Sequence, residues 1–418
     1  MLARRFATLS DTFANTPMTV AIISSVSDIA TSISTRVKPS PPRRRNWRQR
    51  FGAGTKLQCG RLPRGRTAKD PTARGPRLRR NAACGLLCLL LVDAASAQPP
   101  DKPSAEAARA YASAAALQDR GLHDLAAKEW QTLLKTFPQD ALAPRAEYNL
   151  GVCRFQQGDF ANAAETFQQA ARHAQDDSVA EASWSNLGLA RFNEAASQAD
   201  ARPQQAAAAY KSAIAAFDQL IAKFPNSTQA GGAQFYRGES LTALGRFDEA
   251  AASYRNALAD ATASPLHTAA RLGLASAELE LGQPEQAEAT LNTLIAGGAV
   301  GQSGGEAHTL RGEARLAAGQ PASAAEDFAQ AASVEGYAAA DHAQERRAFA
   351  LYSAGDHAAA ADAYQELARR FPESPLTRGA TLAAGKCLLL AGKHDDAAFL
   401  LAAEWRADPT AANAESAH

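Results

Sequence analysis

Cysteine is scarce in this chain of 418 residues, which has five, and their spacing gives neither a zinc pattern nor a disulfide framework. The sequence contains no Gly-rich phosphate loop and no Gly-x-Ser-x-Gly nucleophile motif. Carboxylates are abundant, yet they recur along the chain instead of clustering. We therefore expect no enzymatic activity, no cofactor, no metal and no small-molecule substrate.

Charge divides the chain into two parts that do not belong to one globular unit. Residues 1–97 contain 18 Lys and Arg against 4 Asp and Glu, whereas the remainder contains 26 against 39. The first part is rich in Arg and Pro. The second is rich in Ala and poor in β-branched residues, a composition that favours helix throughout.

Residues 74–97 have the features of a secretory signal peptide. Arg residues between 74 and 80 precede an apolar run from Ala82 to Val92, and Ala95-Ser96-Ala97 follows as a cleavage pattern. The run of eleven residues is shorter than the roughly 20 that span a bilayer, and the alternative is a buried helix. We expect cleavage near Ala97, a periplasmic or secreted protein, and no transmembrane span in the mature chain.

The segment before this signal allows two interpretations. A signal peptide normally begins a chain, so we hypothesise that translation starts downstream of Met1 and that residues 1–73 are a disordered basic segment outside the native protein. The competing interpretation is a cytoplasmic adaptor whose basic tail, with Arg43-Arg44-Arg45, binds nucleic acid.

A pattern of small and aromatic residues recurs along the second part. A small residue, here termed the anchor, is followed by Gly after seven positions, Ala after twelve, and an aromatic residue or Leu after sixteen, as in Gly151, Gly158, Ala163 and Phe167. The anchors are Ala114, Gly151, Gly188, Gly238, Ala275, Gly312, Ala348 and Gly385. Their spacing is 36 or 37 residues, except for one interval of 50 that indicates a 13-residue insertion in the third unit.

Each unit predicts a helical hairpin. A small anchor allows the second helix to approach the first closely, the following Gly stops the first helix in a left-handed conformation, and a residue such as Pro138 or Pro372 ends the second. A single hairpin cannot bury its apolar face, so neighbours must stack. We expect an all-α solenoid of about eight hairpins, with Pro203 starting a lengthened helix that ends at Lys223.

These residues resemble the tetratricopeptide repeat family, because Trp184-x-x-Leu187-Gly188, with Ala213, Phe217 and Pro225 after the insertion, matches its signature. The resemblance implies a right-handed superhelix. The Phe-Pro-polar junctions at 137–140, 224–227 and 371–374 are similar to those of bacterial cell-envelope members associated with the Tol–Pal system and outer-membrane assembly. Ala275 and Ala348 depart from the usual anchor Gly.

The expected domains follow from the repeat. They are a basic segment (1–73), a signal peptide (74–97), a linker (98–106) and a solenoid (107–414), with units near 107–143, 144–180, 181–230, 231–267, 268–304, 305–340, 341–377 and 378–414.

The resemblance implies that the first helices line a concave surface that binds protein or peptide partners. We therefore expect a scaffold protein that acts in cell-envelope assembly. An alternative is a non-catalytic accessory subunit of an enzyme complex. Mapping the family's groove positions onto this chain selects twelve candidates: Tyr111, Arg145, Tyr148, Phe155, Phe192, Asn193, Phe235, Glu239, Glu313, Glu345, Phe349 and Tyr352. The alternative is that these aromatic residues pack between adjacent first helices. The glutamates either favour a basic partner or are solvated surface charges.

The histidines and the two downstream cysteines have structural interpretations. His123, His357 and His394 each lie nine residues after an anchor, where they replace an aromatic residue at the start of the second helix. Equivalent positions in adjacent units lie about 8–10 Å apart, too far to share zinc. Cys153 and Cys387 lie two residues after an anchor, a small buried position.

Overall fold

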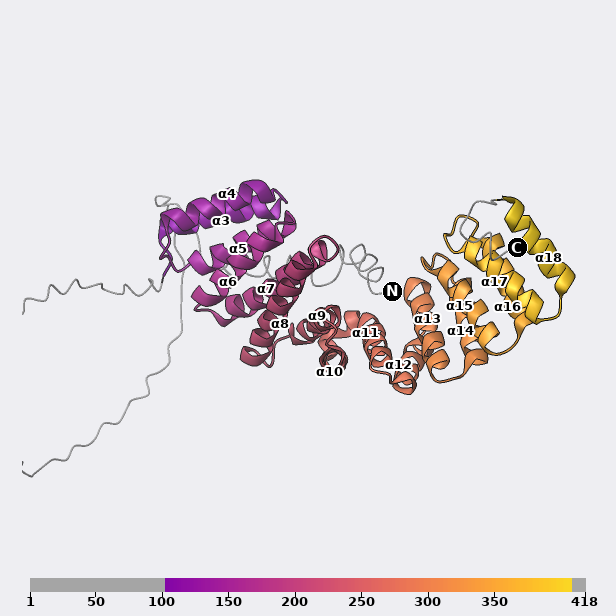
Figure 1. The fold of residues 1–418 in the computed structure, drawn as a ribbon. Coiled ribbons are helices and arrows are strands. Elements are labelled where there is room, and N and C mark those ends of the chain that lie inside the picture. Colours follow the sequence, from indigo (N-terminus) through magenta and orange to yellow (C-terminus); the bar gives the residue numbers. More distant parts are fainter. Residues whose placement is uncertain (1–101, 408–418) are drawn as a thin grey trace, which may run out of the picture. The chain divides into compact units, whose positions relative to one another are not determined.

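The computed structural model describes residues 102–407, so the basic segment, the signal peptide and the residues after 407 lie outside the described part. Residues 102–407 form sixteen α-helices and one short 3-10 helix (Figure 1). The helices are α3 (Ala105–Asp119), α4 (His123–Thr136), α5 (Ala143–Gln156), α6 (Phe160–His173), α7 (Asp177–Gln198), α8 (Pro203–Lys223), α9 (Ala230–Ala243), α10 (Phe247–Ala259), η1 (Ala261–Leu266), α11 (His267–Glu280), α12 (Pro284–Ala296), α13 (Gly301–Ala317), α14 (Pro321–Ser333), α15 (Ala340–Ser353), α16 (His357–Arg370), α17 (Thr377–Leu390) and α18 (His394–Ala407).

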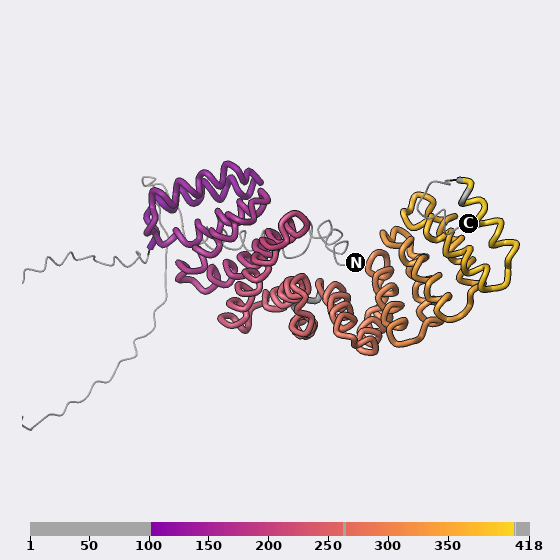
Figure 2. Tube along the Cα trace, viewed as in Figure 1, coloured from indigo at the N-terminus to yellow at the C-terminus, as the bar shows by residue number. Residues whose placement is uncertain are grey.

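Each helix packs against the next one along the chain, and consecutive helices pair as eight hairpins from α3–α4 to α17–α18 (Figure 2). The prediction of an all-α solenoid of about eight hairpins is confirmed. Helices α7 and α13 begin earlier than the expected unit boundaries, at Asp177 and Gly301. At α7 the Asp176 side chain accepts a hydrogen bond from the backbone N–H of Ser178 and so caps the earlier start.

The anchors lie where the two helices of a hairpin come closest. A Cβ atom placed on Gly151 would lie 2.7 Å from the ring of Phe167, and one on Gly238 would lie 2.8 Å from the ring of Tyr254. In each case the aromatic ring belongs to the second helix, sixteen residues after the anchor, and is fully buried. At these glycine anchors the second helix therefore comes this close because the anchor has no side chain.

The insertion and the stop glycines also follow the sequence pattern. Helix α8 runs from Pro203 to Lys223, as the 13-residue insertion predicted. The first helices of seven units end before a Gly with a positive φ, for example 76° at Gly158 and 83° at Gly355. Replacing such a Gly would force a side chain into the left-handed region, which costs roughly 1 kcal/mol.

A polar clasp closes each Phe-Pro junction. The polar residue that ends the junction hydrogen-bonds to the start of the first helix of the same hairpin, at distances of 2.6 to 2.9 Å. The pairs are Asp140 with the backbone N–H of Ser104, Ser227 with Glu181, and Ser374 with Asp341. The clasp thus ties the end of one hairpin to its beginning.

The anchor packing predicts that Gly151→Ala destabilises the solenoid by about 1–3 kcal/mol, because the buried ring of Phe167 must move. Gly379→Ala is the matched control, since a Cβ there meets nothing within 4 Å. That change lies in the first turn of α17 and should leave stability unchanged or raise it by up to about 0.5 kcal/mol. Urea unfolding of both variants measures the difference, and equal effects would contradict the proposed role of the anchor.

Candidate functional site

The candidate site is the A-helix face, which we define on the first helix of each hairpin. It comprises the positions six and three residues before the anchor, and one, four and five residues after it. These positions form one stripe because they follow the helical periodicity. All twelve candidates from the sequence occupy these positions, and they are described below hairpin by hairpin.

In the first two hairpins the A-helix face is closed by contacts between units. The Tyr111 hydroxyl accepts a hydrogen bond from the side chain of Asn149 (2.7 Å), and the Tyr148 hydroxyl accepts one from Asn186 (2.9 Å). Both tyrosines are buried, and burial raises the pKa of Tyr111 to about 12. Their rings are thus buried, and their hydroxyl groups are hydrogen-bonded, inside the solenoid.

The third and fourth hairpins are closed by aromatic packing. Phe192 contacts Tyr210 on the lengthened helix α8 and Tyr236 on α9, with ring centroids 5.8 and 5.4 Å apart. Phe235 is fully buried, and the buried carboxylate of Glu239 accepts a hydrogen bond from the Tyr254 hydroxyl (2.6 Å).

Five of the twelve candidates are therefore interior residues and not accessible groove residues in this structure: Tyr111, Tyr148, Phe192, Phe235 and Glu239. The physical reason is that a large side chain at these positions meets a large or hydrogen-bonding residue of the following helices. The alternative interpretation of the aromatic residues, packing between adjacent helices, describes the four aromatic residues of this set. Glu239 is buried as well, so it is not a solvated surface charge.

Three further candidates of the N-terminal half are half-buried and engaged. Arg145 forms an ion pair with Asp176 (2.6 Å), and Phe155 packs edge-on against Phe160 with ring centroids 5.2 Å apart. The side chain of Asn193 donates to the backbone carbonyl of Leu189 within α7.

The last three hairpins present a different A-helix face. Arg346 forms a bidentate ion pair with Glu313 (2.6 and 2.7 Å) and lies over the ring of Phe349, 4.8 Å from its centroid. Phe349 remains 39% exposed and Tyr352 43% exposed. Glu345 is half-buried on the same stripe of α15. This sector combines accessible aromatic rings with carboxylates.

Two leucines extend this sector and were not among the candidates. Leu389 and Leu390, four and five residues after the anchor Gly385, are 44% and 56% exposed on α17. The same positional mapping that selected Tyr352 also selects Leu389, so the signal was present in the sequence.

The histidines lie at the predicted helix starts, and the prediction that the two cysteines are buried is confirmed. His123, His357 and His394 are the first residues of α4, α16 and α18. His357 contacts Tyr352 at 5.3 Å between centroids, which matches the Phe155–Phe160 contact at the same positions. Both described cysteines are free and buried, and burial raises the pKa of the Cys153 thiol to about 12.

The described residues offer no clear alternative site. Within 102–407, no three His, Cys, Asp or Glu side chains gather in a metal-binding arrangement. In the same range, no helix has both the length and the apolar character to span a membrane.

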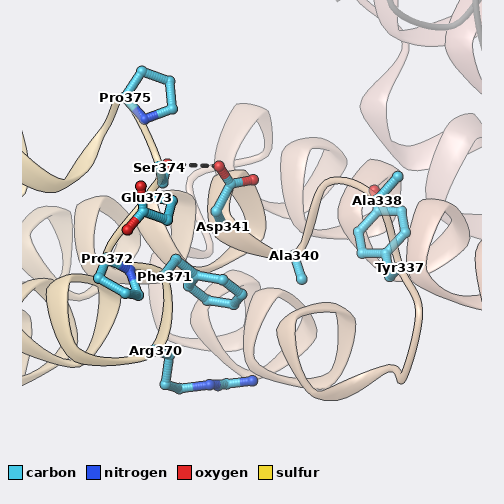
Figure 3. Close-up of a pocket in the computed structure, with 10 residues that line it drawn as sticks. All are labelled: Tyr337, Ala338, Ala340, Asp341, Arg370, Phe371, Pro372, Glu373, Ser374 and Pro375. Atoms are coloured by element: carbon cyan, nitrogen blue, oxygen red, sulfur yellow. Dashed lines mark hydrogen bonds between the residues drawn. The ribbon is translucent and has the colours of Figure 1, made fainter.

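An open hollow of about 530 Å³ lies where the α14–α15 and α16–α17 connections meet (Figure 3). Three of its polar side chains belong to the framework: Ser374 donates to Asp341, and Arg370 donates to the backbone carbonyl of Ala332. The hollow is thus part of a junction clasp and shares no residue with the A-helix face.

A buried cluster of charged residues connects α13 and α14, the helices of the sixth hairpin. The Asp327 carboxylate on α14, only 2% exposed, accepts from His308 (3.1 Å), Arg311 (2.6 Å) and Arg315 (2.8 Å) on α13. Burial by itself raises the pKa of this carboxyl, but the hydrogen bonds from His308 and Arg311 and the charges of Arg311 and Arg315 outweigh it and lower the pKa. Arg315 also pairs with Glu288 on α12 (2.9 Å), so the cluster joins three helices.

We expect Asp327→Asn to destabilise the protein by about 3–5 kcal/mol at pH 7, because it leaves two arginines without their buried counter-charge. A lowered pKa in the folded state gives stability that is present above the unfolded-state pKa of about 3.9 and is lost as pH falls through the folded-state value. The difference between wild type and variant should therefore shrink below about pH 4. Urea unfolding between pH 3 and 7 measures it, and a difference independent of pH would contradict this role.

Comparison with known proteins identifies the repeat. Two sequence profiles of the tetratricopeptide repeat match more than half of the chain, one over residues 111–178, 189–265, 309–375 and 346–412 and the other over 241–300. A comparison with curated proteins gives no match.

Solved structures of similar fold include the C-terminal part of a tetratricopeptide repeat-containing protein from Cytophaga hutchinsonii. It is 16% identical, with a TM-score of 0.51, and the match covers 65% of this chain and 98% of that one. The apo form of RapI is 10% identical (TM-score 0.47; 71% and 87% covered). YrrB, described as a tetratricopeptide repeat protein with an unusual peptide-binding site, is 16% identical (TM-score 0.38; 49% and 98% covered).

Proposed function

Because this chain belongs to the tetratricopeptide repeat family, we propose that it is a non-catalytic scaffold of the cell envelope that holds partner proteins on its A-helix face. The fold is suited to protein binding, since stacked hairpins align their first helices into a continuous surface. The observation that carries the proposal is the accessible pair Phe349 and Tyr352. Exposed aromatic rings with polar neighbours are typical of protein and peptide recognition.

Export is the second part of the proposal, and the sequence of residues 74–97 supports it. A basic stretch, an apolar run from Ala82 to Val92 and the small residues Ala95 and Ala97 occur in the order that signal peptidase substrates require. The acidic excess of the residues after 97 fits a domain that acts apart from the basic segment. The competing function, a cytoplasmic adaptor with a nucleic-acid-binding tail, requires that the basic segment be retained.

We expect the native protein to begin at Gln98 and to appear in the envelope fraction. Edman sequencing of the purified native protein and fractionation of the cells measure both properties. Replacement of the small residues by Ala95→Phe and Ala97→Phe should block cleavage without changing the solenoid. An uncleaved wild-type chain in the cytoplasm would contradict export and would make a nucleic-acid-binding assay the next experiment.

A further inference from the structure

We propose that the A-helix face of the last two hairpins docks a partner segment in which a Lys or Arg side chain is flanked by apolar side chains. The Glu345 carboxylate is the counter-charge for the basic side chain, and Phe349 and Tyr352 contact the apolar ones. This inference rests on the proposed scaffold function and names the sector and the chemistry of its partner.

The seventh hairpin lacks a hydrogen-bonding pair that the first two hairpins form with their neighbours. Three residues before the anchor, the first two hairpins carry Tyr111 and Tyr148, and the next hairpin supplies an Asn two residues before its own anchor. In the seventh hairpin the corresponding residues are Glu345 and Ala383. A methyl group cannot donate a hydrogen bond. Within residues 102–407, burial and nearby charges shift the pKa of Glu345, and no hydrogen bond contributes to the shift.

The electrostatic environment of the Glu345 carboxylate favours binding of a cation. Burial raises the pKa of Glu345, the charges of Arg346 and His342 lower it, and Glu313 raises it. Arg346 directs two hydrogen bonds to Glu313, so it acts on Glu345 through its charge alone. A half-buried carboxylate that accepts no hydrogen bond is only partly solvated, which costs free energy. An ammonium or guanidinium group of a partner would offset this cost by donating a charge-assisted hydrogen bond.

An exposed apolar surface lies beside the Glu345 carboxylate. Phe349 and Tyr352 lie four and seven residues after Glu345, on the same stripe of α15, and Leu389 and Leu390 continue the surface on α17. All four side chains are at least 39% exposed. Phe192, the counterpart of Tyr352 in the third hairpin, is covered by Tyr210 and Tyr236. The face is therefore open at this end of the chain and closed at the other.

Charge complementarity with Glu345 favours a basic partner segment over a purely apolar one. An apolar segment alone would leave the Glu345 carboxylate desolvated and unpaired, which costs free energy. A segment with a Lys or Arg at this point supplies the charge-assisted hydrogen bond and covers the rings at once. Such a pair is worth about 1.5–3 kcal/mol, enough to select basic over neutral segments by roughly tenfold or more.

Panning short random peptides displayed on phage against the purified full chain tests the inference without a known partner. We expect enrichment of peptides that combine Lys or Arg with Leu, Ile or aromatic residues. For an enriched peptide, Glu345→Gln should raise Kd roughly tenfold or more and remove the preference for Lys or Arg over Gln in the peptide. Phe349→Ala combined with Tyr352→Ala should also raise Kd by about tenfold or more.

Glu326→Gln is the matched control, because it makes the same change of charge at an exposed position on helix α14. It should leave Kd unchanged. Folding of Glu345→Gln is checked by thermal unfolding, and we expect it to be as stable as the wild type or slightly more so, since burial disfavours the ionised carboxylate.

Two outcomes separate the inference from the scaffold function. Enriched peptides whose affinity Glu345→Gln does not change, or a dimer that Phe349→Ala with Tyr352→Ala dissociates, would overturn the docking inference and leave the scaffold function standing. Failure to enrich any peptide, together with no cross-linked partner in cells, would contradict both.

Discussion

The close approach of the two helices in each hairpin depends on the anchor, and the rest of the solenoid depends on that approach. A ring from the second helix occupies the space where an anchor side chain would be, as Phe167 does at Gly151. This contact fixes the distance between the helices and thereby sets which stripe of the first helix faces the next hairpin. The residues of the neighbouring helices then decide which positions of that stripe stay exposed.

Hairpins of the same architecture nevertheless differ in which side chains of the A-helix face are exposed. Where a Tyr three residues before the anchor meets an Asn of the next unit, the face closes on itself, as with Tyr148 and Asn186. Where the next unit offers Ala383, the face stays open beside Glu345. The pair of residues that meet at this position, one from each of two adjacent repeats, thus differs between the closed and the open part of the face.

Much of the fold could be predicted from the sequence because its determinants are local and repeated. The spacing of the anchors gave the eight hairpins, and the one irregular interval located the lengthened helix α8. The accessible part of the site was harder to predict. Exposure of Phe192 or Phe349 depends on residues from other helices, such as Tyr210, and a positional mapping within one repeat carries no information about them.

The one-dimensional character of a solenoid explains how such a sector can arise without loss of the fold. Each hairpin packs mainly on its two neighbours, so its stability is set by nearest-neighbour contacts. In the sixth and seventh hairpins, stability is supplied away from the face, by the buried Asp327 cluster and by the clasp between Ser374 and Asp341. The A-helix face above them is therefore free to carry Glu345 and exposed rings, which would be costly in a region where the same residues had to hold the helices together.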